Sequence, residues 1–149
     1  MVMPADYENV EYYGRGPQEN YMDRKESAFI GRYSSTVRDM EDEHYVRAQS
    51  MGNREDVRWL TLTDKDGKGV KVTSKDKLNF SVLHFTDDAL WQAAHDYRLD
   101  EIRRPEIYLS LDAIQQGLGN ASCGPRPLQE YMIPVNSPVS YSFRIEPVR

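Results

Sequence analysis

The sequence contains one cysteine in 149 residues, so no disulfide can form within the chain and the fold depends on the burial of apolar surface. It also lacks an apolar run long enough to cross a bilayer, and Met1 to Pro4 lack the basic and apolar regions of a signal peptide. A basic excess is absent, because 24 acidic residues outnumber 19 basic ones and give a formal charge of −5. We therefore expect a soluble protein that binds neither a membrane nor nucleic acid. A chain of this length suits one domain, which we place over residues 1–149.

Residues patterned for catalysis or metal binding are also scarce. His44, His84 and His95 share no ligand spacing, which argues against a zinc site. Cys123 has no cysteine–histidine signature around it, and no arrangement of the acidic residues singles out a catalytic pair. The acidic stretch 39–44 lacks the spacing and the glycine of a calcium loop, so we interpret it as a solvated turn. We predict no catalytic residue, no metal site and no cofactor in this chain.

The most distinctive stretch runs from Tyr12 to Arg24, where residues with restricted backbone or packing roles follow one another. Two tyrosines suit the end of a strand, two glycines are available for positive φ, and Pro17 requires an extended or turned residue before it. The polar side chains that follow can tie a loop down by hydrogen bonds and an ion pair. A structural corner is the simplest interpretation of these residues. Its members are Gly14, Arg15, Gly16, Pro17, Glu19, Asn20, Tyr21, Asp23 and Arg24.

Short segments with strand-like alternation recur along the rest of the chain, separated by links of turn length. One helix is predicted from Asp87 to about Asp96, with Thr86 as its N-cap. This order indicates an all-β, antiparallel β-sandwich rather than a parallel α/β sheet. The predicted strands are residues 9–13, 29–37, 57–63, 70–73, 78–85, 107–111, 128–133 and 139–145.

Several motifs follow one another in a fixed order. They are residues 14–21 with the sequence Gly-Arg-Gly-Pro-Gln-Glu-Asn-Tyr, then Asp23-Arg24, Gly31-Arg32-Tyr33, Gly52-Asn53-Arg54, residues 56–59, 83–86, 109–112, 117–125 and 141–144. From about Asp6 to its end, the chain resembles the C-terminal domain of bacterial beta-galactosidases of glycoside hydrolase family 2. Collinear matches of this length are more specific than any one motif.

This resemblance implies a fold, an activity and partners. The family domain is a large two-layer β-sandwich, a supersandwich similar to galactose mutarotase, and this chain resembles only its second half. The family hydrolyses terminal β-D-galactosides by a retaining mechanism. Both catalytic glutamates, and the magnesium and sodium sites, lie in an upstream (β/α)8 barrel, so the resemblance implies that this chain is inactive alone. The expected partners are that barrel, the remaining domains, a β-galactoside at the domain edge and further copies in a homo-oligomer, in the cytoplasm or periplasm of a bacterium.

The resemblance also singles out the glycine-rich loop from Gln116 to Pro125. In well-known relatives the position of Cys123 carries a tryptophan that stacks on the sugar. A thiol offers no aromatic face, so the stacking role does not transfer, whereas the placement of the loop at the edge of the sugar site does. The candidate substrate-binding residues are Asn120, Ser122 and Cys123.

Two other classes of function fit the same sequence. A stand-alone carbohydrate-binding β-sandwich module would use exposed tyrosines and Trp59 or Trp91 as a sugar platform. A purely structural or oligomerisation domain would bring no loop to a sugar. The exposure of the two indoles tests the first alternative, because a packed indole cannot also be a platform.

Overall fold

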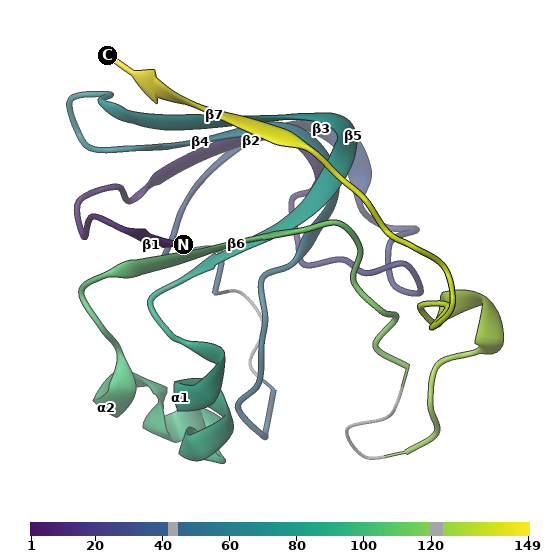
Figure 1. The fold of residues 1–149 in the computed structure, drawn as a ribbon. Helices are drawn as coiled ribbons and strands as arrows, with labels where there is room; N and C mark the ends of the chain where they lie inside the picture. Colours follow the sequence, from purple (N-terminus) through teal and green to yellow (C-terminus); the bar gives the residue numbers. More distant parts are fainter. Residues whose placement is uncertain (42–44, 120–123) are drawn as a thin grey trace.

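A computed structural model describes residues 1–41, 45–119 and 124–149. These residues form a seven-stranded antiparallel sheet with short helices at one end (Figure 1). The strand order is β1-β6-β5-β4-β2-β3, and β7 also pairs with β5. The strands are β1 (Val2–Met3), β2 (Asn9–Gly16), β3 (Phe29–Thr36), β4 (Arg54–Thr63), β5 (Gly69–Leu83), β6 (Ile107–Asp112) and β7 (Phe143–Val148). The helical segments are α1 (Asp87–Ala93), η1 (Asp96–Arg98), α2 (Leu99–Ile102) and η2 (Gln129–Tyr131).

The sheet bends along its two longest strands, β4 and β5. The first part of β5 pairs with β7 through residues 69–74, and the last part pairs with β6 through residues 79–83. Between them the pairing of β4 with β5 shifts its register around Val57, and Asp56 and Lys77 adopt positive φ values of 56° and 71°. Irregularities of this kind bend a strand and increase its twist. Figure 1 shows β5 turning from the part of the sheet that contains β7 to the part that contains β6.

The main hydrophobic core lies inside this bend. It takes alternate residues from both parts of the sheet, because side chains two apart on a strand share one face. The largest of its aromatic residues, Tyr12 and Phe80, pack edge to face with ring centres 5.3 Å apart. The other fully buried members are Val10, Val37, Met40, Val57, Leu60, Leu62, Val72, Leu78, Val82, Ile107 and Leu109.

A second, smaller core lies under the helices. Thr86 caps α1 by accepting a hydrogen bond from the backbone nitrogen of Ala89, and Leu90 and Ala93 form the buried side of the helix. These two residues pack with Ala48, Met51, Leu83, Phe85 and Leu99. The helix therefore fixes the segment that precedes β4 against the end of β5.

The all-β, antiparallel class predicted from sequence is confirmed, but several elements differ. The described residues form one sheet, so the two-layer sandwich stays a prediction. The two strands predicted at residues 70–73 and 78–85 are one bent strand, β5. The strand predicted at residues 139–145 begins only at Phe143, as β7. The strand predicted at 128–133 is wrong: those residues contain the 3-10 turn η2 and pair with no strand among the described residues, because alternation alone does not supply a neighbouring strand. The single predicted helix ends at Ala93, where Ala94 has φ 63°, and α2 follows as a second short helix.

Candidate functional site

The predicted structural corner, residues 14–24, is called the motif below. It begins inside β2, where its two glycines allow close contacts. A Cβ on Gly14 would lie 2.7 Å from Cγ2 of Val57, and one on Gly16 would lie 2.1 Å from the hydroxyl of Tyr12. The positive φ values expected for these glycines are wrong, since both lie in the extended strand and neither has φ above zero. Gly16 is extended before Pro17, as predicted, and the peptide bond between them is cis. Both glycines are therefore needed for space rather than for a turn.

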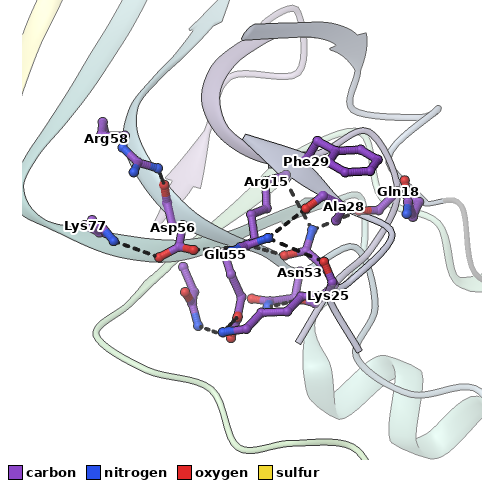
Figure 2. A network of polar contacts seen from close by, with 12 residues as sticks. Arg15, Gln18, Lys25, Ala28, Phe29, Asn53, Glu55, Asp56, Arg58 and Lys77 are labelled. Carbon is purple, nitrogen blue, oxygen red and sulfur yellow. Dashed lines mark hydrogen bonds and ion pairs between the residues drawn. The ribbon is translucent and has the colours of Figure 1, made fainter. Parts of the chain in front are cut away.

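Arg15 connects β2 to the bend of the sheet (Figure 2). Its Nε lies 2.7 Å from Oδ2 of Asp56, and one terminal nitrogen donates to the carbonyl of Ala28 at 2.8 Å. Lys77 approaches the other carboxylate oxygen of Asp56 at 3.3 Å. The two residues with positive φ at the bend are thus paired with each other, and the motif arginine holds the pair from β2.

Two adjacent carboxyl groups at this bend have pKa values shifted in opposite directions. Burial raises the pKa of Glu55, and the charge and hydrogen bond of the nearby Lys25 offset only part of that increase. Burial of Asp56 acts to raise its pKa as well, but hydrogen bonds and charge from Arg15 and Lys77 outweigh burial and lower the pKa below its usual value. Asp56 is therefore held in its ionised form by its two cationic partners.

The lowered pKa of Asp56 predicts a stabilising contribution that depends on pH. Because the folded pKa lies below the unfolded value of about 3.9, the contribution is complete above that pH and is lost as the pH falls through the folded pKa. Asp56→Asn should therefore lower the free energy of unfolding more at about pH 7 than at about pH 3. Urea unfolding at both pH values measures the difference. Asp76→Asn, at an exposed carboxylate, is the control, and an equal loss for Asp56→Asn at both pH values would contradict the prediction.

Asn20 is the centre of the motif's hydrogen-bond network. Its side chain is fully buried, and its Nδ2 donates to the carbonyls of Arg15 and Gln18 at 3.3 and 2.9 Å. Its Oδ1 accepts from the backbone nitrogen of Glu55 at 2.9 Å. Its backbone nitrogen donates to the carbonyl of Asn53, and Nδ2 of Asn53 donates back to the carbonyl of Asn20 at 2.7 Å. One amide side chain thus joins the turn after β2 to the start of β4.

Glu19 is a buried carboxylate that holds three segments together. It accepts hydrogen bonds from the backbone nitrogen of Gly52 at 2.6 Å, from Arg24 at 3.3 Å and from the hydroxyl of Tyr45. Tyr21 lies close by and is itself buried, and burial together with the charge of Glu19 raises the pKa of its hydroxyl far above the usual range. The phenol is consequently neutral at any physiological pH.

Asp23 connects the motif to the glycine-rich loop, 95 residues further along the chain. Its Oδ1 accepts from the backbone nitrogen of Leu118 at 2.9 Å, and its Oδ2 accepts from that of Gly119 at 2.7 Å. Gly117 donates to the carbonyl of Tyr131 at 3.0 Å, and a Cβ on Gly117 would lie 2.8 Å from the Asp23 carboxyl carbon. We call residues 117–119 with Asp23 the loop anchor. Sequence reasoning identified both stretches but not this link, because neither motif carries a signal that it contacts the other.

The three candidate substrate-binding residues, Asn120, Ser122 and Cys123, lie outside the described residues. The loop anchor ends at the residue before them. It therefore fixes the described residues that directly precede them.

The buried carboxylates among the described residues serve structural contacts. Glu19 and Glu55 belong to the motif network, and Glu41 accepts from Arg103 at 2.6 Å and from the backbone nitrogen of His84 at 3.1 Å. The ring of His84 pairs with Glu8 at 2.6 Å. Within residues 1–41, 45–119 and 124–149, no group of three or more His, Cys, Asp or Glu side chains is arranged to hold a metal ion.

Comparison with known proteins shows the family to which the chain belongs. Residues 1–145 match the family model described as beta galactosidase small chain. The chain belongs to this family. It is 34% identical over 150 residues to "Beta-galactosidase BgaC" of Bifidobacterium adolescentis, and 29% identical over 146 residues to a beta-galactosidase of Staphylococcus xylosus. It is also 35% identical over 128 residues to a beta-galactosidase of Kluyveromyces lactis.

These alignments cover most of this small-chain family member but little of each relative. The matches take in 97% of the chain and 14% of the Bifidobacterium protein, 98% and 14% for the Staphylococcus protein, and 85% and 12% for the Kluyveromyces protein. The chain thus corresponds to about one seventh of the beta-galactosidases it matches. In the part of the chain that the structure describes, no helix is long and apolar enough to span a membrane.

Proposed function

We propose that this chain is the non-catalytic C-terminal part of a beta-galactosidase that hydrolyses terminal β-D-galactosides by a retaining mechanism. The observation that carries the proposal is the match of nearly the whole chain to a seventh of each of several beta-galactosidases. A retaining glycosidase needs two carboxyl groups about 5 Å apart, one as acid and base and one as nucleophile. We assign both, with the magnesium and sodium ions, to an upstream barrel.

The partners proposed for the chain are that barrel, the remaining domains and further copies in a homo-oligomer. Several large apolar side chains among the described residues are exposed to solvent, and a partner surface would cover them. Phe29 on the edge strand β3 is 71% exposed, and Leu128 is 66% exposed. Tyr141, Phe143 and Ile145 are partly exposed along β7 and the segment before it. Exposed apolar patches and free strand edges are typical of surfaces that meet another protein segment.

The proposal predicts inactivity alone and activity in a chimera. The purified chain should not hydrolyse a nitrophenyl β-galactoside, because the catalytic pair lies elsewhere. Replacing the matched segment of the Bifidobacterium beta-galactosidase by this chain should give turnover at least about tenfold above that of the same protein with the segment deleted. Turnover by the isolated chain after removal of contaminating enzyme, or a folded chimera without activity, would each contradict the proposal.

We extend the proposal to the loop that follows the loop anchor. In the assembled enzyme Asn120, Ser122 and Cys123 reach the edge of the sugar site, and the small side chain of Cys123 stands where relatives carry a stacking tryptophan. In the chimera, Cys123→Trp should therefore lower the inhibition constant of galactose-like ligands several-fold, the equivalent of about 1 kcal/mol from one stacked ring. Cys123→Ser should change little. An unchanged inhibition constant for Cys123→Trp would favour a purely structural or oligomerisation role.

A stand-alone carbohydrate-binding module is the second candidate, and the exposure of one tryptophan favours it. Trp91 is 66% exposed on α1, although the guanidinium of Arg47 lies 4.4 Å from its ring centre. Trp59 is half-buried between Arg32 and Lys71. Saturable binding of galactose or lactose by the isolated chain, lost in Trp91→Ala, would favour this alternative over the enzyme fragment.

A further inference from the structure

A polar cavity of about 140 Å³ borders the motif at Tyr21. Tyr21 forms part of its wall, together with the segment before β4, the first residue of α1, the neighbouring strands β5 and β6, and Gln115. All of its lining residues except Met51 carry a side-chain oxygen. None is lysine, arginine or histidine. The cavity is thus lined with oxygen atoms and offers no positive charge.

Two of the lining residues are aspartates whose negative charges have no cationic partner in the cavity. Asp87 accepts a hydrogen bond from the hydroxyl of Ser50, and Asp112 accepts one from Nε2 of Gln115 at 2.9 Å. Each of these contacts uses one carboxylate oxygen and comes from a neutral group. The second oxygen of each carboxylate accepts no hydrogen bond from the described residues. Asp87 is exposed and Asp112 is half-buried, and carboxylate oxygens without a counter-charge are ligands that a hard cation prefers.

A third lining residue supplies an independent indication. Asn53 is 3% exposed, and its Nδ2 is fixed by the hydrogen bond to the carbonyl of Asn20 at 2.7 Å. Its Oδ1 is buried and has no hydrogen-bond donor among the described residues. Since Asn53 lines the cavity and its nitrogen is turned to Asn20, the free oxygen is left for an occupant of the cavity. A buried acceptor without a donor is unfavourable unless a donor or a cation meets it.

We propose that this cavity binds one calcium ion, with Asp87, Asp112 and Oδ1 of Asn53 among its ligands. Calcium accepts six to eight oxygen ligands at about 2.3–2.6 Å in irregular geometry and mixes carboxylates with amide oxygens and water. The hydroxyls of Ser81 and Ser110 are further oxygens in the same wall. Magnesium demands near-ideal octahedral geometry, which ligands from separate segments of chain do not readily supply. Two carboxylates also balance the charge of one calcium ion.

Bound calcium would join the start of α1, the end of β6 and the segment before β4. That segment carries Asn53 and Gly52, which bond to Asn20 and Glu19 of the motif. The ion would therefore support the segment to which Asn20 and Glu19 of the motif are bonded. The inference is independent of the proposed enzymatic function.

The test uses the 149-residue chain freed of metal with a chelator and then titrated with calcium chloride. Calorimetry should show one calcium ion bound per chain, and saturating calcium should raise the melting temperature by at least about 4 °C. Asp87→Asn and Asp112→Asn should each weaken binding by at least about tenfold, as expected when a charged ligand is lost. Asp88→Asn is the matched control, because Asp88 lies in the same first turn of α1 but not in the cavity wall, and its affinity should match that of the unchanged chain.

Three outcomes would overturn the proposal. The first is the absence of saturable calcium binding to the unchanged chain, which no variant is needed to observe. The second is equal weakening in Asp87→Asn and Asp88→Asn, which would place calcium on the exposed helix start. The third is binding of magnesium or sodium in place of calcium, measured in parallel titrations, which would show that the cavity selects a different ion. Circular dichroism of each variant confirms that a lost affinity does not arise from unfolding.

Discussion

Replacing Asn20 by alanine is expected to lower the free energy of unfolding by about 3–5 kcal/mol. The substitution leaves two backbone carbonyls and one backbone nitrogen without their partner in a fully buried site. Each unsatisfied buried group costs roughly 1–3 kcal/mol. A domain is stable by only about 5–15 kcal/mol, so the variant should be close to unfolding. Equilibrium unfolding in urea, monitored by circular dichroism, measures the loss.

Gln18→Ala is the matched control for this prediction, because Gln18 is two residues away and, among the described residues, its side chain donates only to the exposed hydroxyl of Ser27. Its stability should stay within about 0.5 kcal/mol of the unchanged chain. Asn20→Asp keeps the acceptor for Glu55 but sets a buried carboxylate against the carbonyl oxygens of Arg15 and Gln18, so it should cost at least as much stability as Asn20→Ala. A loss below about 1 kcal/mol for Asn20→Ala would mean that the turn is held mainly by its other contacts.

Replacing Asp23 by alanine is expected to release the loop anchor. The carboxylate accepts two backbone hydrogen bonds, at 2.9 and 2.7 Å, and bonds to a charged group contribute about 1.5–3 kcal/mol each. Losing both should increase local opening, so the amide protons of Leu118 and Gly119 should exchange with solvent at least about tenfold faster. Hydrogen exchange followed by NMR measures the two amides directly. In the chimera with the Bifidobacterium protein, the same substitution should reduce turnover, because Leu118 and Gly119, which precede the candidate substrate-binding residues, would no longer be held in place.

Asp76→Ala provides the comparison for Asp23→Ala, since Asp76 is an exposed aspartate on the bent strand β5. It should leave the exchange of both amides unchanged. If Asp23→Ala also leaves them unchanged, the bond from Gly117 to Tyr131 is sufficient to position the loop.

The strands and the motif could be predicted where the pattern is local. Alternation along residues 29–36 and 107–112, and the cap at Thr86, depend on neighbouring residues and are found in the structure. The failures have non-local causes. Gly14 must lack a side chain because Val57 approaches it from β4, and no local pattern reports that approach, whereas the Tyr12 hydroxyl next to Gly16 comes from the same strand. The break between two predicted strands at residues 74–77 is a bend in one strand, because a bulge interrupts alternation without ending the pairing.

The candidate site shows the same division. The chemistry of Asn20, Asp23 and Arg24 indicated a fixed loop, and in the structure each of these side chains is held by hydrogen bonds or an ion pair. The contact of Asp23 with residues 118 and 119, and the cavity between Asn53, Asp87 and Asp112, join segments far apart in sequence. Such contacts arise only when the sheet has folded, so spacing along the chain contains no sign of them.

Strands β6 and β7 both pair with the same edge of β5, and this arrangement limits where residues can be inserted or deleted. Residues 69–74 set the register with β7, and residues 79–83 set it with β6, so the four residues between them separate two independent alignments. One residue inserted or deleted there would turn every side chain of one half from the core to the solvent while leaving the other half in place. The turn at residues 64–68, in contrast, could lengthen without moving either alignment. Insertions among natural or designed variants of this chain should therefore be found at that turn and be absent between Ser74 and Asn79.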